Sequence, residues 1–282
     1  MNIAGIDWGG DGPALLFVHP TGFPAGFFDP LARELRDSFR VVGVDLRGHG
    51  ASDKPAADSG LYSYELMAED VIAFLDRMGL DSVMAVGQSL GGGVCVLVDK
   101  IQPGRIATLV LAEGIAHPPV EVPSRAGGAP ADTAHDNFMA SIARKRRAVW
   151  PSRQTMIESY GGRPPLNELA PEALAAYIEW GTIERADGQV ELACPPEIEA
   201  AVFEAAAAPT GAATAWEHLP SLTADAVVLA GTRSDLPQEW FRDQAMRAGA
   251  PFVAVEGGHF FLQEDITRGV ALVRKHLRFT HL

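Results

Sequence analysis

Short, continuously apolar runs alternate with helical patterns through the first 113 residues, and this alternation constrains the fold more than any other feature. The runs occupy residues 14–19, 40–46, 82–87 and 107–113. Runs of this length are typical of strands buried on both faces, as in parallel sheets. Between the second and third runs, apolar residues recur at helical spacing from Met67 to Met78, and Gly79 suits the end of a helix. This order predicts an α/β fold with a doubly wound, mostly parallel sheet.

The alternation is interrupted between residues 117 and 220. Helical patterns in this Pro- and Ala-rich stretch lie at residues 132–149, 171–180 and 198–207. Beyond it, strand patterns at 226–230 and 251–256 alternate with helical patterns at 238–248 and 264–277. Because both flanks share one architecture, we predict a single α/β core made of residues 1–116 and 221–282, with residues 117–220 inserted as a helical cap.

The charge of the chain argues against several classes of partner. Among its 282 residues, 36 are acidic and 23 are basic, which gives a net charge of −13. Nucleic acids and anionic membranes bind clustered positive charge, so we expect neither as a partner. The one basic run, RKRR at residues 144–147, is interpreted as the solvated end of a helix, with contact to a substrate carboxylate as the alternative.

The sequence gives no sign of a membrane segment, a metal site or a cofactor site. No stretch approaches the roughly 18 apolar residues that span a bilayer, and residues 1–13 lack the basic and apolar regions of a signal peptide. Cys95 and Cys194 provide neither a disulfide framework nor metal-binding spacing. We therefore expect a cytoplasmic protein that acts on a small molecule without metal or cofactor. Nothing in the sequence specifies an oligomeric state.

Residues 87–91 read GQSLG and match the pattern GxSxG in an informative context. The match follows the apolar run 82–87 and precedes a Gly-rich helical pattern. A strand-to-helix turn this sharp strains the backbone of Ser89 and requires glycines on either side of it. The turn raises the Ser89 hydroxyl above the carboxyl edge of the sheet, where ligands bind in open α/β sheets. The motif predicts that Ser89 is a nucleophile.

His259 is the best candidate for the general base. It follows the last strand pattern and precedes the last helical pattern, in the segment GGHF. A base needs a pKa near the working pH and a loop position from which it can reach the nucleophile, and a histidine in this loop meets both needs.

Four segments of the chain resemble, in their order, the α/β-hydrolase superfamily in its serine-hydrolase branch. They are FVHPTGF (17–23), DLRGHGASDKP (45–55), GQSLGG (87–92) and GGHF (257–260). The resemblance implies the α/β-hydrolase fold, a Ser nucleophile, a His base, a helical cap after the sixth strand and structural roles for His19 and His49. Ser89 stands where dehalogenases and epoxide hydrolases have Asp, which disfavours those two chemistries.

Two backbone N–H groups are expected to form an oxyanion hole. The first is that of Leu90, which opens the helix after Ser89. The second should come from the loop after the first strand, where the resemblance points to Thr21. This chain has Pro20 where the family usually has Gly, so Gly22 and Phe23 remain alternatives for the second donor.

The third member of a catalytic triad is a carboxylate that orients the histidine, and two residues compete for this role. Asp235 follows the seventh strand, the commoner location of the acid, but lies one residue later than usual, and Ser234 or Asp235 also suits a helix N-cap. Glu113 ends the sixth strand. Zearalenone lactonases and 2-(acetamidomethylene)succinate hydrolases are similar here, with an acid at this location. We favour Glu113, because a charged residue that ends an apolar strand needs a partner.

The sequence therefore predicts a serine hydrolase that cleaves a carboxylic ester or lactone of a small, fairly hydrophobic substrate. Aromatic residues of the insertion are expected to form the core of the cap and part of an apolar pocket. The alternatives are hydrolysis of a C–C bond or an amide by the same triad, and a non-catalytic receptor that binds a small ligand.

Overall fold

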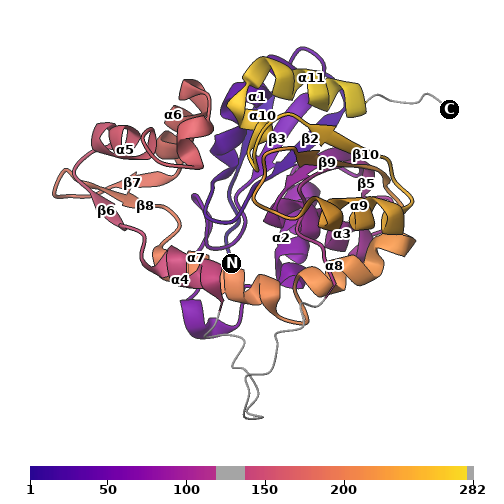
Figure 1. The fold of residues 1–282 in the computed structure, drawn as a ribbon, viewed down its shortest axis with the longest axis horizontal. Helices are drawn as coiled ribbons and strands as arrows, with labels where there is room; N and C mark the ends of the chain where they lie inside the picture. Colours follow the sequence, from indigo (N-terminus) through magenta and orange to yellow (C-terminus); the bar gives the residue numbers. More distant parts are fainter. Residues whose placement is uncertain (119–136, 278–282) are drawn as a thin grey trace, which may run out of the picture.

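A seven-stranded sheet lies at the centre of the structure. The computed structural model describes residues 1–118 and 137–277 (Figure 1). The strands of this sheet are β1 (Gly5–Gly9), β2 (Ala14–Val18), β3 (Arg40–Val44), β4 (Val83–Gln88), β5 (Ile106–Ala112), β9 (Asp225–Gly231) and β10 (Phe252–Val255). Their order is β1-β3-β2-β4-β5-β9-β10. Strand β1 is antiparallel to β3 and the other neighbours are parallel, which confirms the predicted fold class.

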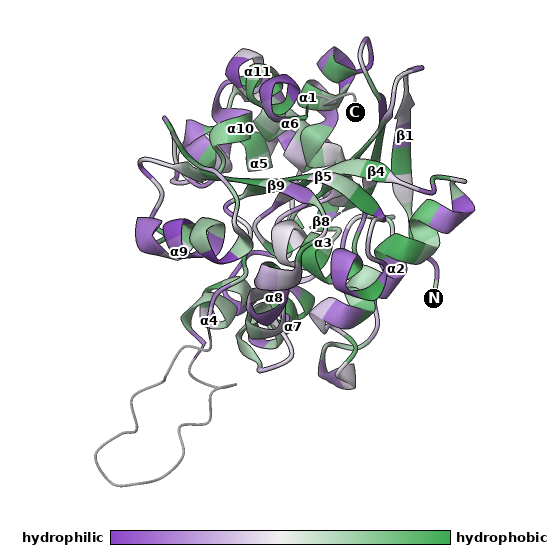
Figure 2. Ribbon diagram, turned by 90° about the vertical axis from the view of Figure 1, so that its right-hand side faces the viewer, coloured by the Kyte–Doolittle hydropathy of each residue, from purple (hydrophilic) through white to green (hydrophobic). Residues whose placement is uncertain are grey.

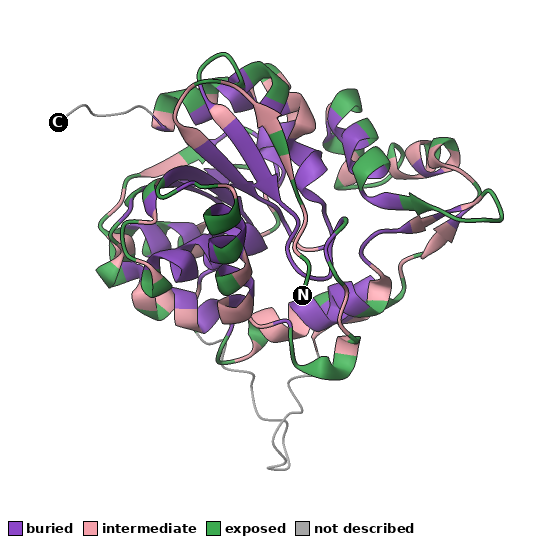
Figure 3. Ribbon diagram, turned by 180° about the vertical axis from the view of Figure 1, so that it is seen from behind, coloured by how far each residue is buried: buried purple, intermediate pink, exposed green. Residues whose placement is uncertain are grey.

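The central strands are buried on both faces, as their apolar runs predict. In β2, Leu16 and Val18 belong to one hydrophobic cluster, whereas Leu15 and Phe17 belong to a second cluster on the opposite face. Figure 3 shows the same pattern as buried strands enclosed by partly exposed helices. Strand β1 was not predicted, because its sequence GIDWG lacks a continuous apolar run.

Helices cover both faces of the sheet (Figures 1 and 2). On one face lie α1 (Asp29–Leu35), α10 (Phe261–Glu264) and α11 (Ile266–His276). On the other lie α2 (Tyr64–Arg77), α3 (Leu90–Ile101), α8 (Ala212–His218) and α9 (Gln238–Ala248). The helix predicted at residues 264–277 is divided, since Asp265 has extended backbone and its side chain caps α11.

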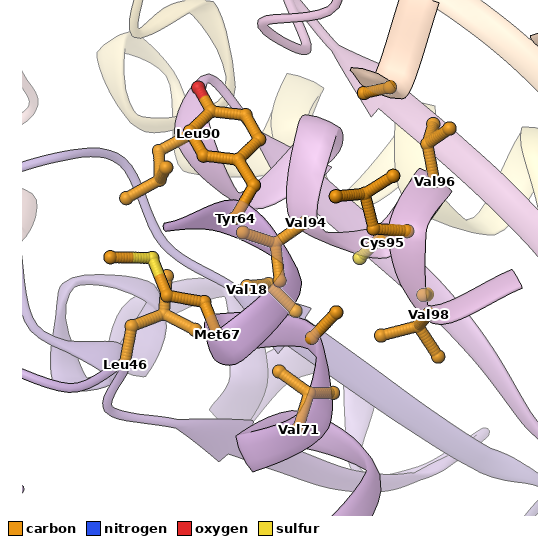
Figure 4. Close-up of a cluster of buried hydrophobic side chains, with 14 of the residues drawn as sticks. Val18, Leu46, Tyr64, Met67, Val71, Leu90, Val94, Cys95, Val96 and Val98 are labelled. Carbon is orange, nitrogen blue, oxygen red and sulfur yellow. The ribbon is translucent and has the colours of Figure 1, made fainter. Parts of the chain in front are cut away.

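The packing of α2 on α3 fixes the start of α3, where the predicted nucleophile lies. Figure 4 shows Tyr64 of α2 beside Leu90 and Val94 of α3 in the larger hydrophobic cluster. A Cβ on Gly93 would lie 2.5 Å from the Tyr64 ring and 2.4 Å from the Ile115 carbonyl oxygen. The glycines of the LGGG segment therefore let α3 approach its neighbours closely.

The segment between β5 and β9 contains helices and a small sheet. Its helices are α4 (Phe138–Arg144), α5 (Arg153–Tyr160), α6 (Pro171–Trp180) and α7 (Pro196–Ala207), followed by α8. Its strands are β6 (Val149–Trp150), β7 (Thr182–Glu184) and β8 (Val190–Leu192), which pair antiparallel in the order β6-β8-β7. Short 3-10 turns occupy Leu166–Glu168 and Leu219–Ser221 of this segment. Two others lie earlier in the chain, at Ala25–Phe28 and Ala57–Ser59.

The predicted helices of the inserted segment correspond to α4, α6 and α7, with one clear difference. The helix predicted at 132–149 ends at Arg144, and Val149 belongs to strand β6. Its first residues, 132–136, lie outside the described residues. The small sheet was not predicted, because strands of two or three residues are too short to show periodicity.

Helix α8 belongs spatially to the core rather than to the rest of the inserted segment. It packs on α3 and lies beside α3 in the larger hydrophobic cluster. His218 Nε2 at the end of α8 lies 3.0 Å from Oδ2 of the buried Asp99 in α3, and Thr223 N–H donates to the same oxygen at 2.9 Å. This carboxylate therefore joins α3 to the segment that leads back into the sheet.

Replacement of Gly91 by Ala should destabilise the protein, because a Cβ there would lie 2.1 Å from the Val18 carbonyl oxygen of β2. Backbone cannot yield as a flexible side chain does, so we expect a loss of at least about 2–3 kcal/mol in the free energy of unfolding. Urea denaturation measures this loss.

The matched control is Gly162→Ala, since the nearest atoms to its added Cβ are 3.9 Å away. It should change the free energy of unfolding by less than about 1 kcal/mol. Equal stability of the two variants would contradict the close approach of α3 to β2.

Candidate active site

Ser89 occupies a strained turn between β4 and α3. Its backbone has φ 55° and ψ −122°, a conformation that L residues rarely adopt. Hydrogen bonds fix the turn on both sides: Ser89 N–H donates to Ala112 O at 3.0 Å, and Ser89 O accepts from Ile115 N–H at 2.8 Å. A Cβ on Gly87 would lie 2.6 Å from Gly91 O, so the flanking glycines are sterically required. The turn places Ser89 at the carboxyl edge of the sheet, as the motif predicts.

The carboxylate of Glu113 lies between three polar groups. The residue directly follows β5, is fully buried and has a positive φ of 48°. Gly231 N–H donates to its Oε1 at 2.7 Å, and Ser234 Oγ donates to its Oε2 at 2.7 Å. His259 Nδ1 lies 2.5 Å from the same Oε2. These contacts provide the partners that a buried carboxylate requires.

Asp235, the other candidate acid, is exposed to solvent. None of the hydrogen bonds found among residues 1–118 and 137–277 joins it to His259. The N-cap interpretation of Ser234 and Asp235 is wrong, since α9 begins after Pro237 without a side-chain cap. Ser234 instead donates to Glu113, a contact that could not be predicted from the sequence because a serine in a loop gives no distinguishing signal.

The loop that carries His259 is tied to the nucleophile turn. Gln88, the residue before Ser89, donates from Nε2 to His259 O at 3.2 Å, and its side chain exchanges hydrogen bonds with the buried Gln263. On the other side, Glu264 Oε1 accepts from Gly258 N–H at 2.6 Å. Between described residues, no direct hydrogen bond joins Ser89 Oγ to His259 Nε2. Such bonds often form only when substrate binds.

The hydrogen bonds of the loop after β2 distinguish the candidate oxyanion donors. Gly22 N–H donates to His49 Nε2 at 3.0 Å, and Phe23 N–H donates to Pro20 O at 3.2 Å. Within the described part of the chain, the N–H groups of Thr21 and Leu90 donate to no other residue. Leu90 is the first residue of α3, where N–H groups lack intrahelical partners. The backbone N–H groups of Thr21 and Leu90 thus remain available as donors within the described structure.

The basic run at residues 144–147 lies at the end of α4, as predicted, but it is not uniformly solvated. Arg144, Lys145 and Arg147 are exposed, but the side chain of Arg146 is only 18% exposed. Its guanidinium forms an ion pair with the buried Glu199 of α7, and its Nη2 donates to the Tyr177 hydroxyl at 2.5 Å. The burial of Arg146 could not be predicted from the sequence, because no pattern distinguishes it from its three basic neighbours.

The Arg146–Glu199 pair lies directly against the loop after β2. A Cβ on Gly22 would lie 2.6 Å from Glu199 Oε1 and 3.2 Å from Arg146 Nη1. Burial raises the pKa of Glu199 because it disfavours the charged carboxylate, and Arg146 partly offsets this effect. The inserted segment thus contacts the predicted oxyanion loop through a buried ion pair.

Aromatic side chains connect the inserted segment to both loops of the site. The Phe23 ring packs at a tilt against Tyr177 of α6, with ring centroids 4.5 Å apart, and against Phe260 at 4.9 Å. Of the cap residues expected in an apolar cluster, Trp150, Met156 and Tyr177 are buried there. Phe138 and Met139 are exposed on α4 instead. The apolar cluster of the inserted segment therefore continues onto residues adjacent to Thr21 and His259.

Among the described residues, no helix has the length and apolar character needed to cross a membrane.

Comparison with known proteins supports the family expected from the motifs. The chain is 35% identical over 150 residues to the non-heme chloroperoxidase of Streptomyces lividans, covering 51% of this chain and 52% of that protein. The chain thus spans about half the length of this relative, and 29–35% of the length of several others. Its fold is similar to the crystal structure of E-2-(acetamidomethylene)succinate hydrolase (TM-score 0.74, 21% identity, 95% of this chain and 92% of that one).

The fold is also similar to a malate-bound thermophilic esterase from Thermogutta terrifontis (TM-score 0.73, 24% identity, 99% of this chain and 94% of that one). A family model described as the alpha/beta hydrolase family matches residues 15–271. This match covers all of the core strands except β1, together with the Ser89 turn and the His259 loop. The chain belongs to the alpha/beta hydrolase family.

Proposed function

We propose that this protein is a serine hydrolase that cleaves a carboxylic ester or lactone through an acyl-enzyme. The observation that carries the proposal is the 2.5 Å contact between His259 Nδ1 and the buried carboxylate of Glu113. This contact orients the imidazole with its Nδ1–H toward the acid, so that Nε2 is free to accept a proton. Ser89, on its strained turn, is the nucleophile that such a base would serve.

The proposed reaction begins when His259 Nε2 takes the proton of Ser89 Oγ as this oxygen attacks the substrate carbonyl. Leu90 and Thr21 donate their N–H groups to the oxyanion of the tetrahedral intermediate. His259 then protonates the departing alkoxide, and Glu113 stabilises the imidazolium throughout. Water, activated by the same histidine, attacks the acyl-enzyme, releases the acid and restores Ser89.

The surroundings of the site support an ester or lactone with apolar substituents. Phe23, Phe260 and Tyr177 pack together where the inserted segment meets the two loops, and we propose that this aromatic cluster lines one side of the site. Apolar walls bind apolar groups, and exclusion of water strengthens the contacts of the oxyanion donors. The esterase among the similar structures is consistent with ester hydrolysis. The same triad chemistry also supports hydrolysis of amides and C–C bonds. Amides and diketones are therefore tested as substrates together with esters and lactones.

Ser89→Ala should abolish hydrolysis of p-nitrophenyl esters and lactones, because it removes the attacking oxygen. Labelling with a fluorophosphonate probe should occur in the wild-type protein and disappear in the variant. Ester turnover retained by Ser89→Ala would contradict the proposal. Tight, saturable ligand binding with no turnover of any ester, lactone, amide or diketone would indicate a receptor instead.

Glu113→Gln should lower kcat for ester hydrolysis by about 10²- to 10⁴-fold, because an amide no longer stabilises the imidazolium and permits the wrong tautomer. The matched control is Asp235→Asn, which replaces an exposed carboxylate by the same chemistry and should change kcat by less than about twofold. Steady-state kinetics of both purified variants measure the effect. A large loss confined to Asp235→Asn would contradict the assignment of Glu113.

A further inference from the structure

Two histidines that take no part in the proposed reaction lie side by side beneath the oxyanion loop. His19 follows β2 and His49 lies in the loop after β3, and both are fully buried. Their ring centroids are 4.8 Å apart. Fully buried histidines need defined partners for both ring nitrogens, so their hydrogen bonds reveal what they do.

Each histidine accepts a backbone hydrogen bond from the loop that carries the other. Leu46 N–H donates to His19 Nε2 at 2.9 Å, and Gly22 N–H donates to His49 Nε2 at 3.0 Å. A backbone N–H can only donate, so each Nε2 carries no proton. Each Nδ1–H then donates to a carbonyl, that of Pro20 for His19 (2.8 Å) and that of Arg47 for His49 (3.0 Å). Both rings are therefore neutral, with the proton on Nδ1.

The environment of the two rings keeps them neutral. Burial lowers the pKa of His19 to about 4, and burial together with the neighbouring His19 lowers the pKa of His49 to about 3. Two charged groups face His49 from its own loop: Asp45 favours its protonation and Lys54 opposes it. Asp45 is itself held by N–H groups of both loops, with Ala25 at 2.7 Å and Ala51 at 2.9 Å.

These contacts determine which N–H group of the oxyanion loop remains available. His49 accepts from Gly22, and Pro20 accepts from Phe23, so only Thr21 among the three candidate donors is unpaired within the described structure. The Arg146–Glu199 pair also packs closely against Gly22, since a Cβ there would lie 2.6 Å from Glu199 Oε1. His49 thus fixes the loop from within the core, while the inserted segment covers it.

We propose that His49 is a positioning residue for catalysis: its Nε2 holds the Gly22 N–H group and thereby directs the Thr21 N–H group toward the oxyanion. This proposal rests on the proposed serine-hydrolase function. His49 touches no substrate in this arrangement and acts through the backbone of the loop. Its loss should therefore affect the transition state more than substrate binding.

His49→Ala should lower kcat for p-nitrophenyl ester hydrolysis by about 10- to 100-fold while KM changes less than about threefold, since complete loss of one oxyanion donor costs about 10²- to 10³-fold. The affinity for a trifluoromethyl ketone, which forms a tetrahedral adduct, should fall by the same factor as kcat/KM. His49→Gln retains an acceptor oxygen near the position of Nε2 and should restore most of the activity.

His218→Ala is the control for loss of a histidine that bonds inside the core, because His218 contacts Asp99 far along the chain from the oxyanion loop. It should retain kcat when assayed well below its melting temperature. The proposal is overturned if His49→Ala retains wild-type kcat, if His49→Gln is no better than His49→Ala, or if His218→Ala loses as much activity.

Nuclear magnetic resonance of ¹⁵N-labelled wild-type protein separates this proposal from the proposed function, because it requires no turnover. His49 should show a protonated Nδ1 and an unprotonated Nε2, unchanged between pH 8 and pH 5. Titration of His49 within this range, or a protonated Nε2, would overturn the positioning role. If the spectrum is as expected but the protein hydrolyses no ester, the proposed function is rejected while the loop geometry remains supported.

Discussion

The contact between Glu113 and His259 is the interaction on which the rest of the site depends. It joins the end of β5 to the loop after β10, across the intervening strand β9. Strand order places β4, β5, β9 and β10 side by side, so that the Ser89 turn, Glu113 and the His259 loop meet at one edge of the sheet. A buried carboxylate without partners would be strongly unfavourable. The backbone of Gly231 and the hydroxyl of Ser234 supply the remaining hydrogen bonds and fix the rotamer of the acid.

The loop after β2, which we propose forms part of an oxyanion hole, contacts two polar assemblies of different chemistry. On the core side, neutral His19 and His49 exchange hydrogen bonds between the loops after β2 and β3. On the other side, the buried ion pair of Arg146 and Glu199 contacts Gly22. Buried ion pairs contribute little net stability, but removal of one partner is strongly destabilising because it leaves an uncompensated buried charge. We therefore expect these contacts to restrict movement of the loop. Such restriction would preorganise its N–H groups for a developing negative charge.

The parts of this structure that were predictable are those encoded in local patterns. The buried strands could be predicted because each is a continuous apolar run. Ser89 and His259 directly follow such runs, so the parallel topology places both at the carboxyl edge of the sheet. Glu113 was favoured for a physical reason that the structure explains, since a carboxylate closing a buried strand must find partners. Strand β1 and the small sheet of the inserted segment were missed, because their residues carry little or no periodicity.

The remaining features depend on contacts between residues far apart in the sequence. The sequence pattern suggested a helix N-cap at Ser234, whereas its hydroxyl donates to Glu113, a residue 121 positions away. Arg146 differs from its basic neighbours only through Glu199 and Tyr177, which come from α7 and α6. His49 is one of several histidines in the sequence, and its partner is a backbone group 27 positions away. No local pattern specifies such partners.

The central claim, that Glu113 orients His259, is tested most directly by proton magnetic resonance of the His259 Nδ1–H. A short hydrogen bond to a carboxylate shifts this proton far downfield. The resonance should be present in the wild-type protein, persist in Asp235→Asn and vanish from its downfield position in Glu113→Gln. A downfield resonance that survives Glu113→Gln and is lost in Asp235→Asn would contradict the claim.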